Sequence, residues 1–163
     1  MNKPVLVFAY GNLSRGDDGL APLLIEQLSD NADIEILTDF QLQVEHALDL
    51  ENRQLVLFID ASVSCQTAFE FVELQPLRDK SYSTHAMSPA AVLQVYQSIH
   101  HQQPPPCFLL SIQGVSFELG EPLSLIAENN LGLAVNFVKK LLANRAIDFW
   151  AGQSKSVCTK YRY

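Results

Sequence analysis

Three aspartates and one histidine occupy positions where an α/β protein places its chemistry. Asp17 and Asp18 follow the first apolar run of the chain. Asp60 follows the third such run, and His85 comes after the fourth. Ligands of open α/β sheets bind beyond the carboxyl ends of the strands, so residues distant in sequence can meet there. Two carboxylates and an imidazole suit a divalent transition metal and could also act as acid and base, which makes Asp18, Asp60 and His85 the candidate site.

Each of these residues also has a simpler structural explanation. Asp18 lies where a helix is expected to begin, so it could cap that helix, and Asp17 could compete for the same role. Asp60 could bond backbone amides of the turn that follows it. His85 could be an ordinary loop histidine. The occurrence of all three residues at strand ends favours a functional site over these separate explanations.

The apolar pattern around the candidate residues predicts alternating strands and helices. Residues 4–10 form an apolar run typical of a strand buried on both faces, and residues 55–59 form another that stops at Asp60. Leucines at helical spacing after Asp18 predict a helix up to about residue 30. Further strands are expected at 34–37, 68–74 and 108–112, and further helices at 41–50, 89–99 and 123–142.

This order of elements predicts one α/β domain with a mainly parallel five-stranded sheet covered by helices on both sides. A chain of 163 residues is long enough for one core and short for two. We expect residues 1–145 to form the domain. Residues 146–163 show no clear period, so this C-terminal tail could either pack as an extension or remain mobile.

Composition excludes several classes of function. A formal charge of -7 without clustered Lys and Arg excludes a nucleic-acid-binding face. The apolar runs are too interrupted to span a bilayer, and the first is too short for a signal sequence. Three widely spaced cysteines, without a Cys-x-x-Cys pair, favour a reducing compartment, so we predict a cytoplasmic protein. The glycine spacing matches neither a phosphate loop nor a dinucleotide fingerprint.

Four segments resemble one known family. Residues 11–19 read Gly-Asn-Leu-Ser-Arg-Gly-Asp-Asp-Gly, similar to the Gly-Asn-x-Leu-x-Gly-Asp-[Asp/Glu]-Gly signature of the hydrogenase-maturation proteases. Residues 58–61 resemble the strand-end Asp-Ala of that family, residues 83–88 its histidine loop, and residues 114–122 its late loop. The resemblance covers about residues 5 to 142. It departs at 38–42, where Thr-Asp-Phe-Gln-Leu replaces the common Asp-Gly-Gly-Thr segment.

The resemblance implies a twisted, mostly parallel sheet between helices and a specific activity. Such an enzyme is an endopeptidase that removes a C-terminal peptide from the precursor of a nickel-iron hydrogenase large subunit after nickel insertion. The acidic and histidine positions of the family fall on Asp18, Asp60 and His85, which would be both catalytic and metal-binding and would recognise nickel carried by the substrate. The implied partner is the precursor, with no nucleic acid and no membrane involved.

Two other functions remain open at this point. A metal-dependent maturation chaperone would bind the precursor without changing its length. A nucleoside or small-molecule hydrolase could use a related α/β fold, although the sequence shows no obvious purine-binding set. Turnover of nucleosides without any precursor would identify the second of these alternatives.

Overall fold

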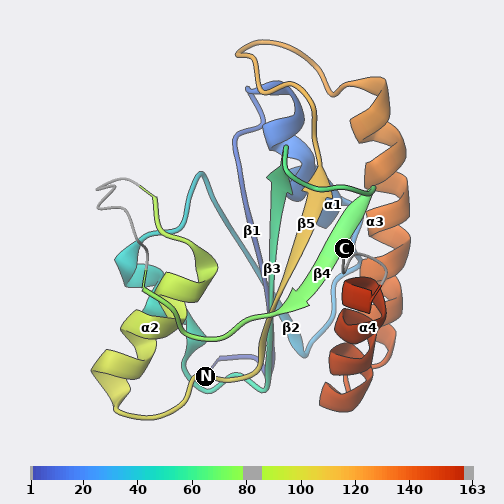
Figure 1. Cartoon of the computed structure of the whole chain (residues 1–163). Helices are drawn as coiled ribbons and strands as arrows, with labels where there is room; N and C mark the ends of the chain where they lie inside the picture. The colour runs from blue at the N-terminus through green and yellow to red at the C-terminus, as the bar shows by residue number, and fades with distance from the viewer. Residues whose placement is uncertain (1, 79–85, 160–163) are drawn as a thin grey trace.

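A mostly parallel, twisted sheet forms the centre of the molecule (Figure 1). The computed structural model describes residues 2–78 and 86–159, with side chains through Ser154. The strand order is β2-β1-β3-β5-β4, and only β4, at an edge, runs antiparallel to its neighbour. This arrangement confirms the predicted fold class. The strands are β1 (Val5–Tyr10), β2 (Ile34–Asp39), β3 (Leu55–Ser62), β4 (Phe69–Glu73) and β5 (Cys107–Gln113).

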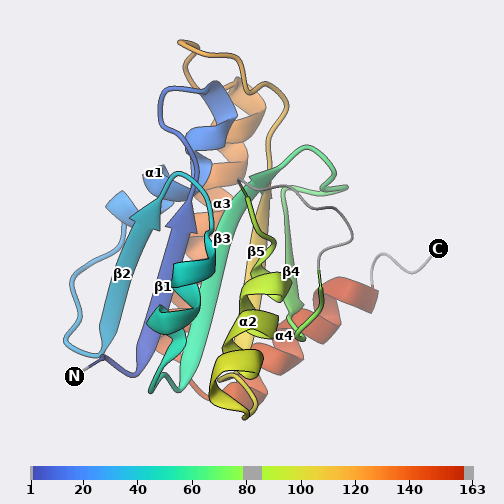
Figure 2. The same cartoon turned by 90° about the vertical axis from the view of Figure 1, so that its left-hand side faces the viewer.

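Helices cover both faces of the sheet because both faces are apolar. Alternate side chains of a strand point to opposite sides, and β1 is buried along its whole length. Its odd-numbered residues pack with α1 and α3, while its even-numbered residues pack with η2 and α2 (Figures 1 and 2). The first layer consists of α1 (Leu20–Glu26), α3 (Leu125–Ala143) and α4 (Ile147–Thr159), and the second of the 3-10 helix η2 (Val44–Leu50) and α2 (Pro89–His100).

The start of α2 follows from two neighbouring residues. The Ser88 hydroxyl accepts a hydrogen bond from the Ala91 amide at 3.1 Å, and Pro89 occupies the first helical position, where a missing N–H costs nothing. The helix ends at His100, and the next residue, His101, adopts a left-handed conformation with φ of 53° ahead of three prolines. The expected helix at 41–50 forms instead as the tighter 3-10 helix η2.

The C-terminal segment packs on the sheet. Trp150 of α4 is fully buried, and its ring meets Phe71 and Phe108 edge-on at 6.4 and 5.5 Å between centroids. The indole N–H donates to the carbonyls of Leu141 and Asn144, both at 2.9 Å. Of the two alternatives left open for the tail, packing as an extension is therefore the one that the structure shows for residues 147–154. Across the described residues, no helix is both long and apolar enough to cross a bilayer.

Candidate active site

The carboxyl ends of β1 and β3 bring Tyr10 and Asp60 together. These strands are parallel neighbours in which Ala9 lies beside Ile59, so the next residues along each strand are also adjacent. Both side chains belong to the face covered by η2 and α2, and the Tyr10 hydroxyl donates a hydrogen bond to the Asp60 carboxylate. Sequence reasoning missed Tyr10. Only the register of β1 against β3 reveals it, because its residue type alone suggests core packing.

The environment of Asp60 favours its neutral form. Burial raises the pKa of this carboxyl to about 7, and the nearby negative charge of Asp18 raises it as well. Hydrogen bonds from the Ala61 amide and from Tyr10 act in the opposite direction. Burial and the charge of Asp60 likewise raise the pKa of Tyr10 well above its ordinary value. The expected bond to a following amide therefore exists, but Asp60 also shares its surroundings with a second carboxylate.

Asp18 does not cap a helix, so that explanation for it was wrong. Its Oδ2 accepts a hydrogen bond from the Asn12 amide at 2.9 Å, which holds the carboxylate against the loop that leaves β1. The cap of α1 is Gly19, and no side chain bonds there. The loop passes so close to itself that a Cβ on Gly11, whose φ is 151°, would lie 2.1 Å from the Asp18 carbonyl oxygen. The position of Asp18 thus depends on a glycine at residue 11.

Asp17 has a structural role that its neighbour lacks. The side chain is fully buried and accepts hydrogen bonds from the Val115, Ser116 and Ser124 amides, at 2.8, 3.2 and 2.8 Å, and from the Ser124 hydroxyl at 2.8 Å. Burial alone would raise the pKa of Asp17, but these bonds bring it below its ordinary value. Asp17 therefore ties the loop after β1 to the loop between β5 and α3, and the suggestion that it competes for a helix cap was wrong.

His85 lies outside the described residues. The described chain resumes at Ala86, and the Met87 amide donates to the Leu42 carbonyl at 3.2 Å on the same face of the sheet as Tyr10 and Asp60. Within the described part of the chain, no three His, Cys, Asp or Glu side chains are close enough to hold a metal ion. The structure therefore brings together two of the three predicted site residues, Asp18 and Asp60.

An aspartate and a histidine form a pair at the end of β2. Asp39 is beside Tyr10 in the β1–β2 register, and its Oδ2 lies 3.1 Å from Nε2 of His46. Nδ1 of His46 accepts a hydrogen bond from the Gln43 amide at 2.8 Å, so Nε2 carries the ring proton and donates a hydrogen bond to Asp39. The imidazole also meets the Phe8 ring edge-on at 4.7 Å. This pair fixes η2 against the end of β2.

Cys65 is near the site but has no reactive thiol. Its Sγ is 3.5 Å from the Ser111 carbonyl oxygen, and the residue is buried. Burial, followed by the negative charge of Glu70, raises the pKa of the Cys65 thiol to about 11, so it stays protonated at neutral pH. We therefore keep it out of the candidate site.

Comparison with solved structures finds the same fold in hydrogenase-processing enzymes. The hydrogenase maturating endopeptidase HybD from E. coli is 23% identical, with 89% of this chain and 93% of that one covered and a TM-score of 0.68. The [NiFe] hydrogenase maturation protease HycI from Thermococcus kodakarensis is 22% identical, with 87% and 94% covered and a TM-score of 0.65. A hydrogenase 2 maturation peptidase from a Thaumarchaeota archaeon is 22% identical, with 86% and 99% covered and a TM-score of 0.61.

These comparisons confirm, at the level of the fold, the resemblance read from the sequence motifs. The chain spans nearly the whole length of each of the three proteins, so the likeness involves complete domains and not a shared fragment. Neither the known protein-family models nor the curated proteins gave a match.

Proposed function

We propose that this protein is an endopeptidase that removes a C-terminal peptide from the precursor of a nickel-iron hydrogenase large subunit once nickel has been inserted. The observation that carries the proposal is that Asp18 and Asp60 lie near enough at the carboxyl edge of this fold for the charge of Asp18 to raise the pKa of Asp60. Both residues stand at the motif positions where the sequence resembles the maturation proteases. The solved proteins with this fold are themselves described as hydrogenase maturation endopeptidases and proteases.

The chemistry of the two carboxylates fits a divalent cation. The charge of Asp18 disfavours ionisation of Asp60, so a cation that binds both would replace this repulsion with attraction. His85 would add a nitrogen ligand from the segment before α2. Three protein ligands leave coordination positions open for the ligands of the precursor or for water. Nickel would thus arrive with the substrate, and cleavage would wait until the metal is in place.

Peptide hydrolysis at this site requires one water molecule. Its oxygen bonds to the scissile carbonyl carbon, the C–N bond breaks, and the departing amine takes up a proton. A cation near the carbonyl oxygen would stabilise the negative charge that develops there. The contribution of Asp18 and Asp60 is to hold the cation, and that of Tyr10 is to orient the Asp60 carboxylate through its hydrogen bond.

Exposed apolar side chains around the site support a protein substrate over a nucleoside or other small molecule. Five apolar side chains here are each at least half exposed, with Phe40 at 73%: Leu13, Phe40, Val63, Val115 and Leu119. They lie in the loops beyond the carboxyl ends of β1, β2, β3 and β5, the edge that also carries Asp18 and Asp60. Apolar side chains gathered around a polar site are typical of protein–protein contact surfaces. We place the reaction in the cytoplasm, as the cysteine pattern predicts.

Substitutions at the site test the proposal directly. Intact mass spectrometry measures shortening of the nickel-loaded precursor. Shortening should be abolished in each of three variants, Asp18→Ala, Asp60→Ala and His85→Ala. Glu128→Ala, on the exposed surface of α3, is the matched control and should process normally. Unimpaired processing by all three site variants would refute the proposed site. A wild-type protein that binds the precursor and never shortens it would instead support a non-cleaving maturation chaperone.

A further inference from the structure

Among residues 2–78 and 86–159, no strand pairs with the outer edge of β2. β2 pairs with β1 on one side only and ends the sheet order (Figure 2). The Val5 amide donates to the Asp33 carbonyl and the Gly11 amide to the Asp39 carbonyl. In a parallel pair of strands, these bonds mean that the backbone N–H and C=O groups of the odd-numbered residues of β2 point toward β1. The backbone groups of Ile34, Ile36 and Thr38 therefore point outward.

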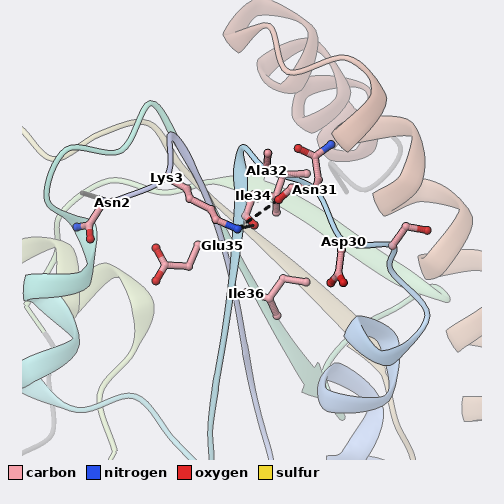
Figure 3. Close-up of a pocket in the computed structure, with 9 residues that line it drawn as sticks. Asn2, Lys3, Asp30, Asn31, Ala32, Ile34, Glu35 and Ile36 are labelled. Carbon is pink, nitrogen blue, oxygen red and sulfur yellow. Dashed lines mark hydrogen bonds between the residues drawn. The ribbon is translucent and has the colours of Figure 1, made fainter.

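The half of this edge that is farther from the candidate site is already closed. The Ile34 amide donates to the Asn31 carbonyl, and Nζ of Lys3 bonds the carbonyls of Ile34 and Asn31 at 3.2 and 3.3 Å (Figure 3). A lysine at a strand edge is a common protection against unwanted strand pairing. Among the described residues, nothing comparable bonds the outward groups of Ile36 and Thr38. The open half is therefore the one that leads toward Asp18.

A cleft of about 560 Å³ continues the open half of the edge. It lies between the end of β2, the loop after β1 and the helix α1, and it includes Asn12, whose amide holds the Asp18 carboxylate. The described residues that line it combine apolar side chains with the carboxylates of Glu26 and Asp39, and none of them is Lys, Arg or His. Glu26 is exposed. The cleft thus suits a chain segment with apolar side chains and a basic one.

We propose that an extended segment of the precursor adds to the sheet as a strand beside Ile36 and Thr38 and places alternate side chains in this cleft. This inference rests on the proposed function, since the precursor is the occupant. Strand addition gives affinity through main-chain hydrogen bonds and selectivity through pockets for every second side chain. It would also lead the bound chain directly to the loop that carries Asp18. The precursor segment should carry a basic side chain that lies near Glu26.

Amide hydrogen exchange tests the proposal at the two residues concerned. In the free protein the amides of Ile36 and Thr38 face outward and should exchange quickly, whereas the Leu37 amide already faces β1. The Asp60→Ala variant should not cleave, and enough nickel-loaded precursor is added to saturate it despite the lost metal contact. In that complex, exchange at Ile36 and Thr38 is expected to slow by about tenfold or more. Unchanged exchange at both amides in a complex formed with that variant would overturn the proposed docking.

A proline pair provides the second test. Thr38→Pro removes the backbone N–H that points away from β1 and leaves the hydrogen bonds between β2 and β1 intact. Edge strands tolerate proline at such a position. It should raise the KM for the precursor about tenfold with little change in kcat, since each lost main-chain bond weakens binding. Glu73→Pro is the matched control, because even-numbered residues of β4 bond β5 and the Glu73 amide faces outward on the opposite edge. It should leave KM unchanged.

The charge of the cleft is tested by reversal. Glu26→Lys should raise the KM for the precursor, whereas Glu128→Lys on α3 should not. Normal KM values for both Thr38→Pro and Glu26→Lys, with wild-type cleavage intact, would overturn the docking inference and leave the proposed function standing. Absence of any binding and cleavage by the wild-type protein would overturn the proposed function, and the docking inference with it.

Discussion

At the scale of single residues, two adjacent aspartates have separate roles. Asp17 is buried under four hydrogen bonds, whereas Asp18 accepts one from Asn12 and adds its charge to the environment of Asp60. The sequence reads Asp-Asp and cannot separate them. The partners of Asp17 lie about a hundred residues away in the loop before α3, and no local pattern predicts which of the two carboxylates meets that loop.

Substitution by asparagine should distinguish the two aspartates. The Asp17 carboxylate accepts four hydrogen bonds, whereas one end of an asparagine side chain is an NH2 group that cannot accept any. In Asp17→Asn at least one buried backbone N–H therefore loses its acceptor, and the free energy of unfolding should fall by about 2 kcal/mol or more. Asp18→Asn should change stability by less than about 0.5 kcal/mol and abolish processing. Urea denaturation and the processing assay measure the two effects. Equal stability losses would contradict the assignment.

The pKa of Asp60 predicts how precursor binding depends on pH. Below about pH 7 the carboxyl is mostly protonated and must lose its proton before it binds a cation. Affinity for the nickel-loaded precursor should therefore fall by up to about tenfold per pH unit below about pH 7 and level off above it. Tyr10→Phe removes a hydrogen bond that lowers the pKa of Asp60, so the pH above which the affinity becomes constant should be higher in this variant. Identical profiles for the two proteins would contradict a role for Asp60 in binding the metal.

At the scale of elements, the turn after β1 sets the geometry of the site. Gly11→Ala would place a Cβ 2.1 Å from the Asp18 carbonyl oxygen. The loop must then shift, and we expect losses of both processing and about 2 kcal/mol or more of stability. Gly132→Ala is the matched control, because no atom beyond the local backbone of α3 lies within 4 Å of the added Cβ and alanine favours the helix. It should keep full activity and gain up to about 1 kcal/mol by chemical denaturation. A fully active Gly11→Ala variant would contradict this account.

The helix α4 is tested through its buried tryptophan. Trp150→Ala should lower the free energy of unfolding by about 3–5 kcal/mol, because it leaves a cavity against Phe71 and Phe108. Ile147→Ala, at the exposed start of the same helix, should cost less than about 1 kcal/mol. Thermal or chemical denaturation of both variants measures the difference. Similar small losses would show that α4 does not contribute to the core.

Sequence predicts an element well when residues within that element determine its structure, and poorly when contacts with distant residues do. The continuous apolar runs of β1 and β3 predict buried parallel strands, and the acidic interruptions of β4 place it at an edge, as observed. The apolar spacing of residues 41–50 predicts a helix but not its 3-10 form, which occurs together with the contacts of His46 with Gln43 and Asp39. The packing of α4 depends on one aromatic residue in a segment without a period, so sequence alone left it undecided.

At the scale of the whole molecule, parallel topology explains why part of the site was predictable. Strand ends in a parallel sheet point to one edge, so Asp18 and Asp60 could be placed together without knowledge of any contact. Tyr10 required the register of β1 and β3, and the open edge of β2 required the strand order. Neither is encoded in local composition. His85 stays a prediction, since it lies outside the described residues.

Intact mass spectrometry tests most directly whether cleavage by this protein waits for nickel. The purified protein is incubated with nickel-loaded and with nickel-free precursor of the large subunit, and the Asp60→Ala variant serves as the inactive control. We predict loss of a C-terminal peptide only from the nickel-loaded precursor and only with the wild-type protein. Equal shortening of both precursors would contradict the nickel checkpoint, and no shortening of either would contradict the endopeptidase activity itself.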